Sequence, residues 1–169
     1  DASILRKLTT RADIRSFDPV MDQVASGSTL IILDQADVWA ARLASFDYPA
    51  VEYRGFERWG KQGQIFVGKS PFLTGLPQAC GMNWEYQSFY RGDVWGLRFA
   101  RTGVETIAAL AANHRGEILD ALSRIRFGNG QVIISTLRIL PELSSEKPQS
   151  AVPKKLFLNL LEYGKQVKE

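Results

Sequence analysis

Residues 118–137 read ILDALSRIRFGNGQVIISTL, and this stretch carries the clearest local structural signal in the chain. Two runs rich in Ile, Val and Leu flank the turn Gly128-Asn129-Gly130. Glycine and asparagine tolerate the positive φ angles that tight hairpin turns require. The stretch therefore predicts an antiparallel β-hairpin.

The opening third alternates helices with a strand. Apolar residues at helical spacing predict helices over residues 17–25 and 36–44, with the buried strand TLIIL at residues 29–33 between them. Near the other end, residues 152–167 predict a closing helix whose Leu156, Leu160, Leu161 and Tyr163 share one stripe. Short buried strands alternating with helices favour the α/β class.

The middle of the chain is less regular. Residues 47–63 mix aromatics, arginines and glycines and predict a long loop. Short strands are predicted at residues 64–68, 83–89 and 94–99, the second because polar and aromatic residues alternate there. We expect a three-layer sandwich with a mostly parallel sheet, to which the hairpin over residues 118–137 is added in antiparallel fashion.

Composition indicates one globular domain over residues 1–169. The chain is 45% hydrophobic and 23% charged, and a chain of this size can bury roughly 70% of its unfolded surface. Cys80 is the only cysteine, which excludes an internal disulfide and a cysteine-rich zinc site. Asp1 stands where an initiator methionine would be, and no secretory signal pattern follows it, so we expect a domain excised from a longer multidomain protein.

The composition also bears on partners. No apolar run approaches the roughly 20 residues that cross a bilayer, so we expect a soluble chain without a membrane partner. The net charge is +3, with lysines concentrated towards the C-terminus, where a closing helix would present them to solvent. The sequence therefore predicts no nucleic-acid partner.

The last third resembles a known kind of domain. The succession GNGQVIISTL (128–137), a proline-marked loop and LFLNLLEY (156–163) is similar to the end of glutamine-amidotransferase-like, flavodoxin-like α/β domains. These domains occur as accessory modules in β-galactosidase-like members of glycoside hydrolase family 2. The earlier segments VASGSTLIIL (24–33) and KSPFLTGLP (69–77) resemble parts of the same modules.

The resemblance implies a function as well as a fold. It implies a flavodoxin-like or class I amidotransferase-like fold, and a non-catalytic accessory module of a glycoside hydrolase. The expected partners are the other domains of that enzyme and, as a further expectation, carbohydrate. A bacterial parent of this kind would place the chain in the periplasm or outside the cell.

Cysteine chemistry is a poor fit to the sequence. An active amidotransferase needs a cysteine on a sharp strand-to-helix turn, with backbone N–H groups for the oxyanion and a histidine base. Cys80 follows Pro77-Gln-Ala rather than a strand, and His114, the only histidine, lies in the turn-like run Asn-His-Arg-Gly. We therefore predict a partly buried thiol and a loop imidazole, with no catalytic pair.

The sequence contains the residue pattern of a phosphate-binding loop. Residues 63–70, from Gly63 to Lys69-Ser70, satisfy G-x-x-x-x-G-K-[ST]. In a working loop a strand ends at the first glycine and a helix begins at the lysine. Here a strand is predicted inside the motif, and Pro71 and Pro77 prevent a long helix after it. A nucleotide-binding enzyme that uses this segment is kept as an alternative function.

Other candidate groups lack the spacing that chemistry requires. A glycosidase needs two carboxylates facing each other across a sugar, and nothing in the sequence pairs the available ones. Those considered are Asp34, Asp37, Glu85 and Asp93. Ser135 lacks the Gly-x-Ser-x-Gly elbow of serine hydrolases. We predict no catalytic residue, no cofactor and no metal ion in this domain.

Aromatic residues gather in one segment. Trp84, Tyr86, Phe89, Tyr90 and Trp95 are interleaved with polar residues, and the favoured interpretation is packing in the core or against a neighbouring domain. The alternative is stacking on sugar rings, whose C–H faces are apolar. The residues assigned to such carbohydrate contact are Trp84, Tyr86, Tyr90 and Trp95. A free-standing carbohydrate-binding module is the remaining alternative function.

Overall fold

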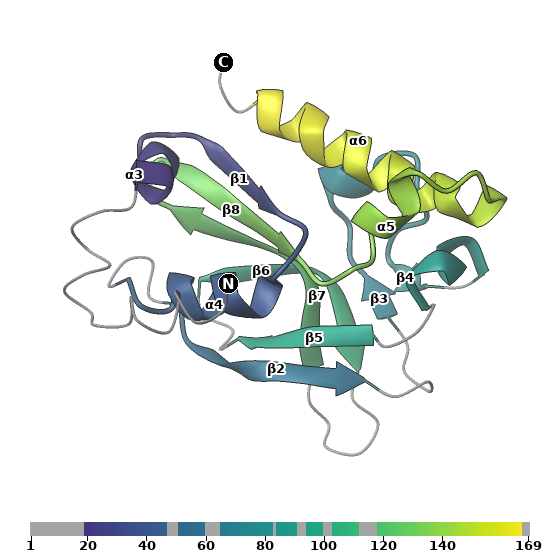
Figure 1. The fold of residues 1–169 in the computed structure, drawn as a ribbon, viewed down its shortest axis with the longest axis horizontal. Coiled ribbons are helices and arrows are strands. Elements are labelled where there is room, and N and C mark those ends of the chain that lie inside the picture. The colour runs from purple at the N-terminus through teal and green to yellow at the C-terminus, as the bar shows by residue number, and fades with distance from the viewer. Residues whose placement is uncertain are drawn as a thin grey trace.

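The structure is a computed structural model that describes residues 19–46, 51–59, 65–82, 84–90, 94–99, 103–111 and 118–166. Figure 1 shows how its helices and strands are arranged. The α-helices are α3 (Pro19–Ala25), α4 (Ala36–Leu43), α5 (Leu140–Leu143) and α6 (Ala151–Gln166), and the 3₁₀ helices are η1 (Pro71–Leu73), η2 (Trp84–Tyr90) and η3 (Pro148–Ser150). The strands are β1 (Thr29–Ile32), β2 (Tyr53–Trp59), β3 (Ile65–Val67), β4 (Cys80–Gly81), β5 (Val94–Phe99), β6 (Val104–Ala111), β7 (Ile118–Phe127) and β8 (Gly130–Ser135).

The strands form one mixed, eight-stranded sheet. Its main path runs β1-β8-β7-β6-β3-β4, and β5 joins β7 to β2 off this path. Among the described strands only β1 and β8 pair in parallel; the other pairs are antiparallel. Antiparallel strands can be joined by short turns, whereas parallel strands need a long connection, and residues 33–129 lie between β1 and β8.

The sheet forks at β7, its longest strand. One edge of β7 pairs with β6, and the C-terminal half of the other edge pairs with β8 from Leu122 onwards. Near its N-terminal end, at Asp120, β7 pairs instead with Leu97 of β5. Thr136 bridges the fork, because its N–H donates to the carbonyl of Ala121 over 2.9 Å and its hydroxyl to that of Trp95 over 2.6 Å.

Helices cover both faces of the sheet, and each face carries its own core (Figure 1). The α6-side core contains Leu156 and Leu160 of α6, and the α4-side core contains Ala40 and Leu43 of α4. Strand β8 alternates between the two, with Ile133 on the α6 side and its neighbours on the α4 side. A strand covered on both faces reads as a continuous apolar run, which is why the hairpin dominates the sequence.

The β7–β8 turn is locked against the end of α3. Gly128 has φ +59°, and a Cβ atom there would lie 2.6 Å from the carbonyl oxygen of Ala25. The N–H of Asn129 donates to that same carbonyl over 2.9 Å. At Gly130 a Cβ atom would overlap the backbone oxygens of Val24 and Ser28. The predicted hairpin is confirmed, and both glycines are required by the close approach of α3.

The predicted fold class is wrong. The protein is mainly a mixed sheet with few short helices, not a flavodoxin-like or amidotransferase-like three-layer sandwich with a mostly parallel sheet. The opening helix-strand-helix pattern is present as α3, β1 and α4, but it does not continue. From β2 to β8 strands follow one another with no intervening α-helix among the described residues.

Individual elements show where the sequence patterns were informative. Helices α3, α4 and α6 and strands β1, β3 and β5 are confirmed close to their predicted bounds. The predicted loop over residues 47–63 contains strand β2, and strand β6 was not predicted. The predicted strand over residues 83–89 is wrong, because η2 occupies this stretch. None of the helices in the described ranges is both long and apolar enough to cross a membrane.

Candidate functional site

The candidate site is the segment η2, a seven-residue 3₁₀ helix with the sequence WEYQSFY. Such helices have three residues per turn, so side chains three apart lie above one another. Tyr86 and Phe89 are buried in the α6-side core, whereas Trp84 is 78% exposed and Gln87 is also exposed. One edge of η2 thus anchors the segment and another edge, defined here as the ridge of Trp84 and Gln87, faces solvent.

Tyr86 fixes η2 to the preceding loop. Its ring is fully buried and its hydroxyl donates to the carbonyl of Pro77. Burial raises the pKa of Tyr86 to about 12, and the nearby Cys80 and Glu85 add to the rise. The segment also packs against α6 and η3, at the end of the molecule where α6 begins (Figure 1). The ridge therefore stands on a well-anchored support.

The aromatic residues assigned to carbohydrate contact do not form one platform. Tyr86 is buried and offers no face to a sugar, and the side chain of Tyr90 lies outside the described residues. Trp95 is on β5, half-buried, and stacks on Phe56 with ring centroids 4.7 Å apart and planes at 13°. Trp84 alone of the assigned side chains that are described stands free in solvent.

The packing interpretation fits some of the aromatic residues and not others. It holds for Tyr86, Phe89 and, in part, Trp95. Trp84 is not packed in the core of this chain, because its side chain is exposed, and its contact with a neighbouring domain stays a prediction. The buried aromatic residues Tyr86 and Phe89 are three residues apart, and this spacing is the sequence feature that matches a 3₁₀ helix. In such a helix Gln87 lies on the same edge as Trp84, and Tyr86 lies on a different edge.

The phosphate-loop-like segment uses its backbone donors internally. The N–H of Gly68 donates to the carbonyl of Ile107 over 2.8 Å, and that of Ser70 donates to Oε1 of Gln78 over 3.0 Å. The Ser70 hydroxyl accepts from the N–H of Phe72, which caps the short helix η1. Gly63 lies outside the described residues. The N–H groups of Gly68 and Ser70 that would cradle a phosphate are therefore engaged.

The other candidate groups are scattered. Cys80 sits in the two-residue strand β4, not on a strand-to-helix turn, and His114 lies outside the described residues. Ser135 is buried; its hydroxyl donates to the carbonyl of Ala121 and accepts from the N–H of Leu137. Within the described ranges no three His, Cys, Asp or Glu side chains gather where they could hold a metal ion.

Of the candidate carboxylates that are described, two lie at the start of α4 and one lies on η2. Asp34 accepts a hydrogen bond from the N–H of Gln35 at 2.9 Å. Asp37, on α4, adds to the rise in the pKa of Tyr53, which burial brings to about 12. Glu85 is on η2, next to the exposed ridge, and Asp93 lies outside the described residues. Among the described carboxylates, Glu85 is the neighbour of Trp84 on η2.

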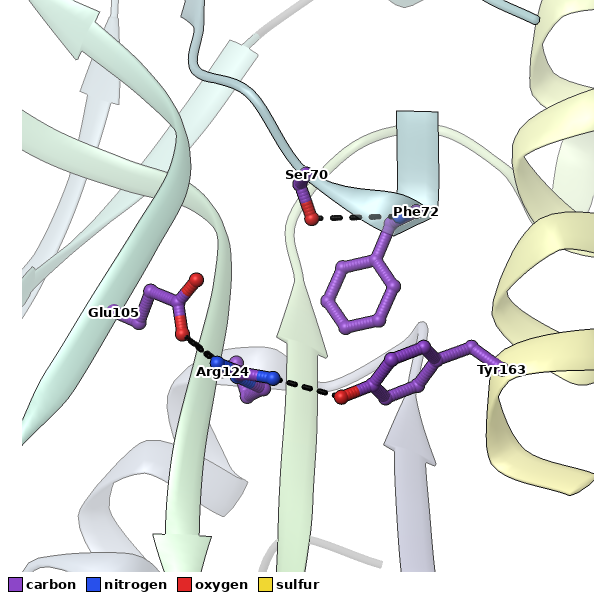
Figure 2. A network of polar contacts seen from close by, with 5 residues as sticks. All are labelled: Ser70, Phe72, Glu105, Arg124 and Tyr163. Atoms are coloured by element: carbon purple, nitrogen blue, oxygen red, sulfur yellow. Dashed lines mark hydrogen bonds and ion pairs between the residues drawn. The ribbon is translucent and has the colours of Figure 1, made fainter. Parts of the chain in front are cut away.

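A polar network joins the sheet to α6 (Figure 2). Nε of Arg124, on β7, donates to Glu105 over 2.7 Å, and its Nη1 donates to the hydroxyl of Tyr163 over 2.7 Å. Tyr163 packs edge-on against Phe72, with ring centroids 4.5 Å apart. Burial lowers the pKa of Arg124, but its bonds to Glu105 and Tyr163 outweigh this, so the pKa is raised. The network positions α6, against which η2 packs.

A buried acidic group that the sequence did not predict lies at the fork of the sheet. Oδ1 of Asp120 accepts from the hydroxyls of Thr106 and Ser123, the latter over 3.1 Å. The aspartate is almost fully buried. A lone acid within an apolar strand carries no sequence signal for this arrangement, because Thr106 is on another strand.

Comparison with protein-family models and with curated protein sequences finds no match. Among solved structures, the chain is similar to a β-galactosidase from Bacillus circulans sp. alkalophilus, with 16% sequence identity and a TM-score of 0.43. The similarity covers 85% of this chain and 20% of that chain, so this chain spans about a fifth of that enzyme's length. A bacterial glycoside hydrolase is thus a distant structural neighbour, at a level that assigns neither family nor activity.

Proposed function

We propose that this chain is a non-catalytic accessory module of a β-galactosidase-like glycoside hydrolase and that it contacts carbohydrate through the ridge of Trp84 and Gln87. The observation that carries the proposal is the 78% exposure of Trp84 on a helix whose other edge is anchored in the core. The kind of parent enzyme is proposed from the sequence resemblance, although the amidotransferase-like fold that this resemblance implied is wrong.

An exposed tryptophan on a fixed support suits a sugar ring. The indole has a large apolar face that can cover the C–H face of a pyranose, and its N–H is a donor. Gln87 contributes an amide that both donates and accepts, and the carboxylate of Glu85 is an acceptor. An exposed aromatic with polar neighbours is the combination that recognises an apolar ring bearing hydroxyl groups.

The engaged backbone of residues 68–70 supports a binding role over the nucleotide alternative. A phosphate would have to displace the hydrogen bonds of Gly68 to Ile107 and of Ser70 to Gln78. The place of Cys80 in a two-residue strand likewise disfavours glutaminase chemistry. An accessory module needs neither reaction, since it serves by holding the enzyme on its substrate.

The test is a titration of galacto-, cello- and xylo-oligosaccharides against the purified chain by calorimetry. We expect saturable binding of at least one series, weakened about tenfold or more in Trp84→Ala, a change of roughly 1.4 kcal/mol or more in binding free energy. Leu158→Ala is the matched control, because Leu158 is 52% exposed on α6 and is outside the ridge. Binding that survives Trp84→Ala unchanged, or no binding to any series, would overturn the proposal.

A further inference from the structure

The shape of the ridge bears on which part of a carbohydrate it meets. A 3₁₀ helix rises about 2.0 Å per residue, so Trp84 and Gln87 are offset by roughly 6 Å along the axis of η2. This offset is of the order of one sugar unit. A chain lying along η2 would therefore place neighbouring units against Trp84 and Gln87 in turn.

The exposure of Trp84 indicates an open surface and not a pocket. Ligand pockets bury about 70–90% of a small ligand, and walls that enclose a terminal sugar also cover the aromatic ring beneath it. Trp84 is 78% exposed, and Gln87 is exposed as well. Within the part of the chain that the structure describes, such a ridge contacts one side of a sugar chain and does not surround its end.

The ridge is also held in place before any ligand arrives. Tyr86 and Phe89 are buried on the other edge of η2, and the Tyr86 hydroxyl is bonded to the Pro77 carbonyl. A pre-ordered surface loses little conformational entropy on binding, so even small contacts with successive units add to the affinity.

From these features, and resting on the function proposed above, we infer that the ligand is the interior of an extended polysaccharide chain and not a chain end or a free monosaccharide. The contacts are non-covalent: stacking on Trp84 and hydrogen bonds to Gln87. Affinity then grows with chain length until the ridge is spanned, and it does not depend on the terminal units.

The experiment uses oligosaccharides of increasing length from the series that binds best, measured by calorimetry on the intact chain. We expect the dissociation constant to fall about tenfold or more from the monosaccharide to the longest oligosaccharide, which is about 1.4 kcal/mol. Chemical capping of either terminal unit should leave the affinity of the longest member unchanged. In Trp84→Ala and Gln87→Ala the gain with length should shrink, and Leu158→Ala should keep it.

The outcomes separate this inference from the proposed function. Equal affinity for the monosaccharide and the longest oligosaccharide, or loss of binding on capping one end, would overturn the inference while leaving carbohydrate binding through Trp84 intact. Failure of every length to bind would overturn both. Folding of each variant is checked by its melting temperature, and Trp84→Phe, which keeps a smaller aromatic face, should bind with intermediate affinity.

Discussion

The β7–β8 hairpin is covered on both faces, whereas the segment η2 is buried along one edge and exposed along another. In the hairpin, strand periodicity, turn glycines and burial on both sheet faces all agree, and Gly128 and Gly130 are fixed by the backbone of α3. In η2, aromatic and polar residues also alternate in part, yet the segment turns with a period of three and divides into a buried and an exposed edge. Alternation of polar and apolar residues therefore specifies a strand only where a neighbouring strand can pair with it.

The largest expected effect tests the two edges of η2. Tyr86→Ala removes a fully buried aromatic side chain and should lower the free energy of unfolding by about 4 kcal/mol, because a cavity is left. Trp84→Ala should change it by less than about 0.5 kcal/mol, since the side chain is exposed. Urea unfolding of both variants measures the difference. Equal losses in the two variants would show that η2 does not divide into two edges.

The next effect concerns the hairpin turn. Gly130→Ala places a Cβ atom onto the backbone oxygens of Val24 and Ser28, and overpacking against backbone should cost about 3 kcal/mol. The matched control is Gly68→Ala, because a Cβ atom there would meet only the carbonyl of Ile107 at an ordinary 3.5 Å. Thermal unfolding of the two variants makes the comparison. A Gly130→Ala protein as stable as Gly68→Ala would contradict the tight contact between the turn and α3.

A smaller effect is expected at high pH. Burial raises the pKa of Tyr86 to about 12, whereas an unfolded tyrosine ionises near pH 10. The stability due to the neutral phenol is therefore complete below pH 10 and is lost as the pH rises from about 10 to about 12. The free energy of unfolding of Tyr86→Phe should fall less steeply with pH over this range. At neutral pH this variant is less stable than the parent, because the hydrogen bond to Pro77 is missing.

Tyr53 provides the internal comparison for that titration. Its pKa is also raised to about 12, by burial and by Asp37, but it packs on the α4-side core. Tyr53→Phe should therefore remove a separate part of the alkaline loss. Urea midpoints measured at pH 9, 10 and 11 give the slopes. An unchanged slope in both phenylalanine variants would contradict the assignment of the alkaline loss to these two phenols.

Much of the fold could be predicted from local patterns, and its topology could not. Helices α3, α4 and α6 and the hairpin follow from apolar periodicity and turn residues. The pairing of β5 with β7 at Asp120 and the bridge from Thr136 to Trp95 depend on contacts far apart in the sequence. Nothing in the apolar runs distinguishes a parallel from an antiparallel partner, so the expected parallel sheet was wrong.

The candidate site was predictable in part. The aromatic segment was singled out, but a strand pattern groups Trp84 with Tyr86, whereas the 3₁₀ helix groups Trp84 with Gln87. Which edge is buried depends on α6 and η3 packing against η2, and this packing is a tertiary property. For Trp95, the partner Phe56 comes from a segment predicted as a loop, so their stacking could not be foreseen.

The smallest expected effect links the two regions through α6, which packs on η2 and bonds to β7. Tyr163→Phe removes the hydroxyl that accepts from Arg124 but keeps the edge-on contact with Phe72. Because Arg124 retains Glu105, the free energy of unfolding should fall by only about 1 kcal/mol, with an unchanged urea m-value.

Additivity shows whether that hydrogen bond acts through Arg124. Arg124→Met should cost more than Tyr163→Phe, and the double variant should cost clearly less than the sum, since the two side chains share one bond. Oligosaccharide affinity should be the same in Tyr163→Phe as in the parent, because η2 has its own anchors in Tyr86 and Phe89. Strict additivity would contradict the bond between Arg124 and Tyr163. A loss of affinity in Tyr163→Phe would show that the ridge depends on the packing of α6. The ridge and the hairpin would then not be independent of each other, because α6 packs on η2 and bonds to β7.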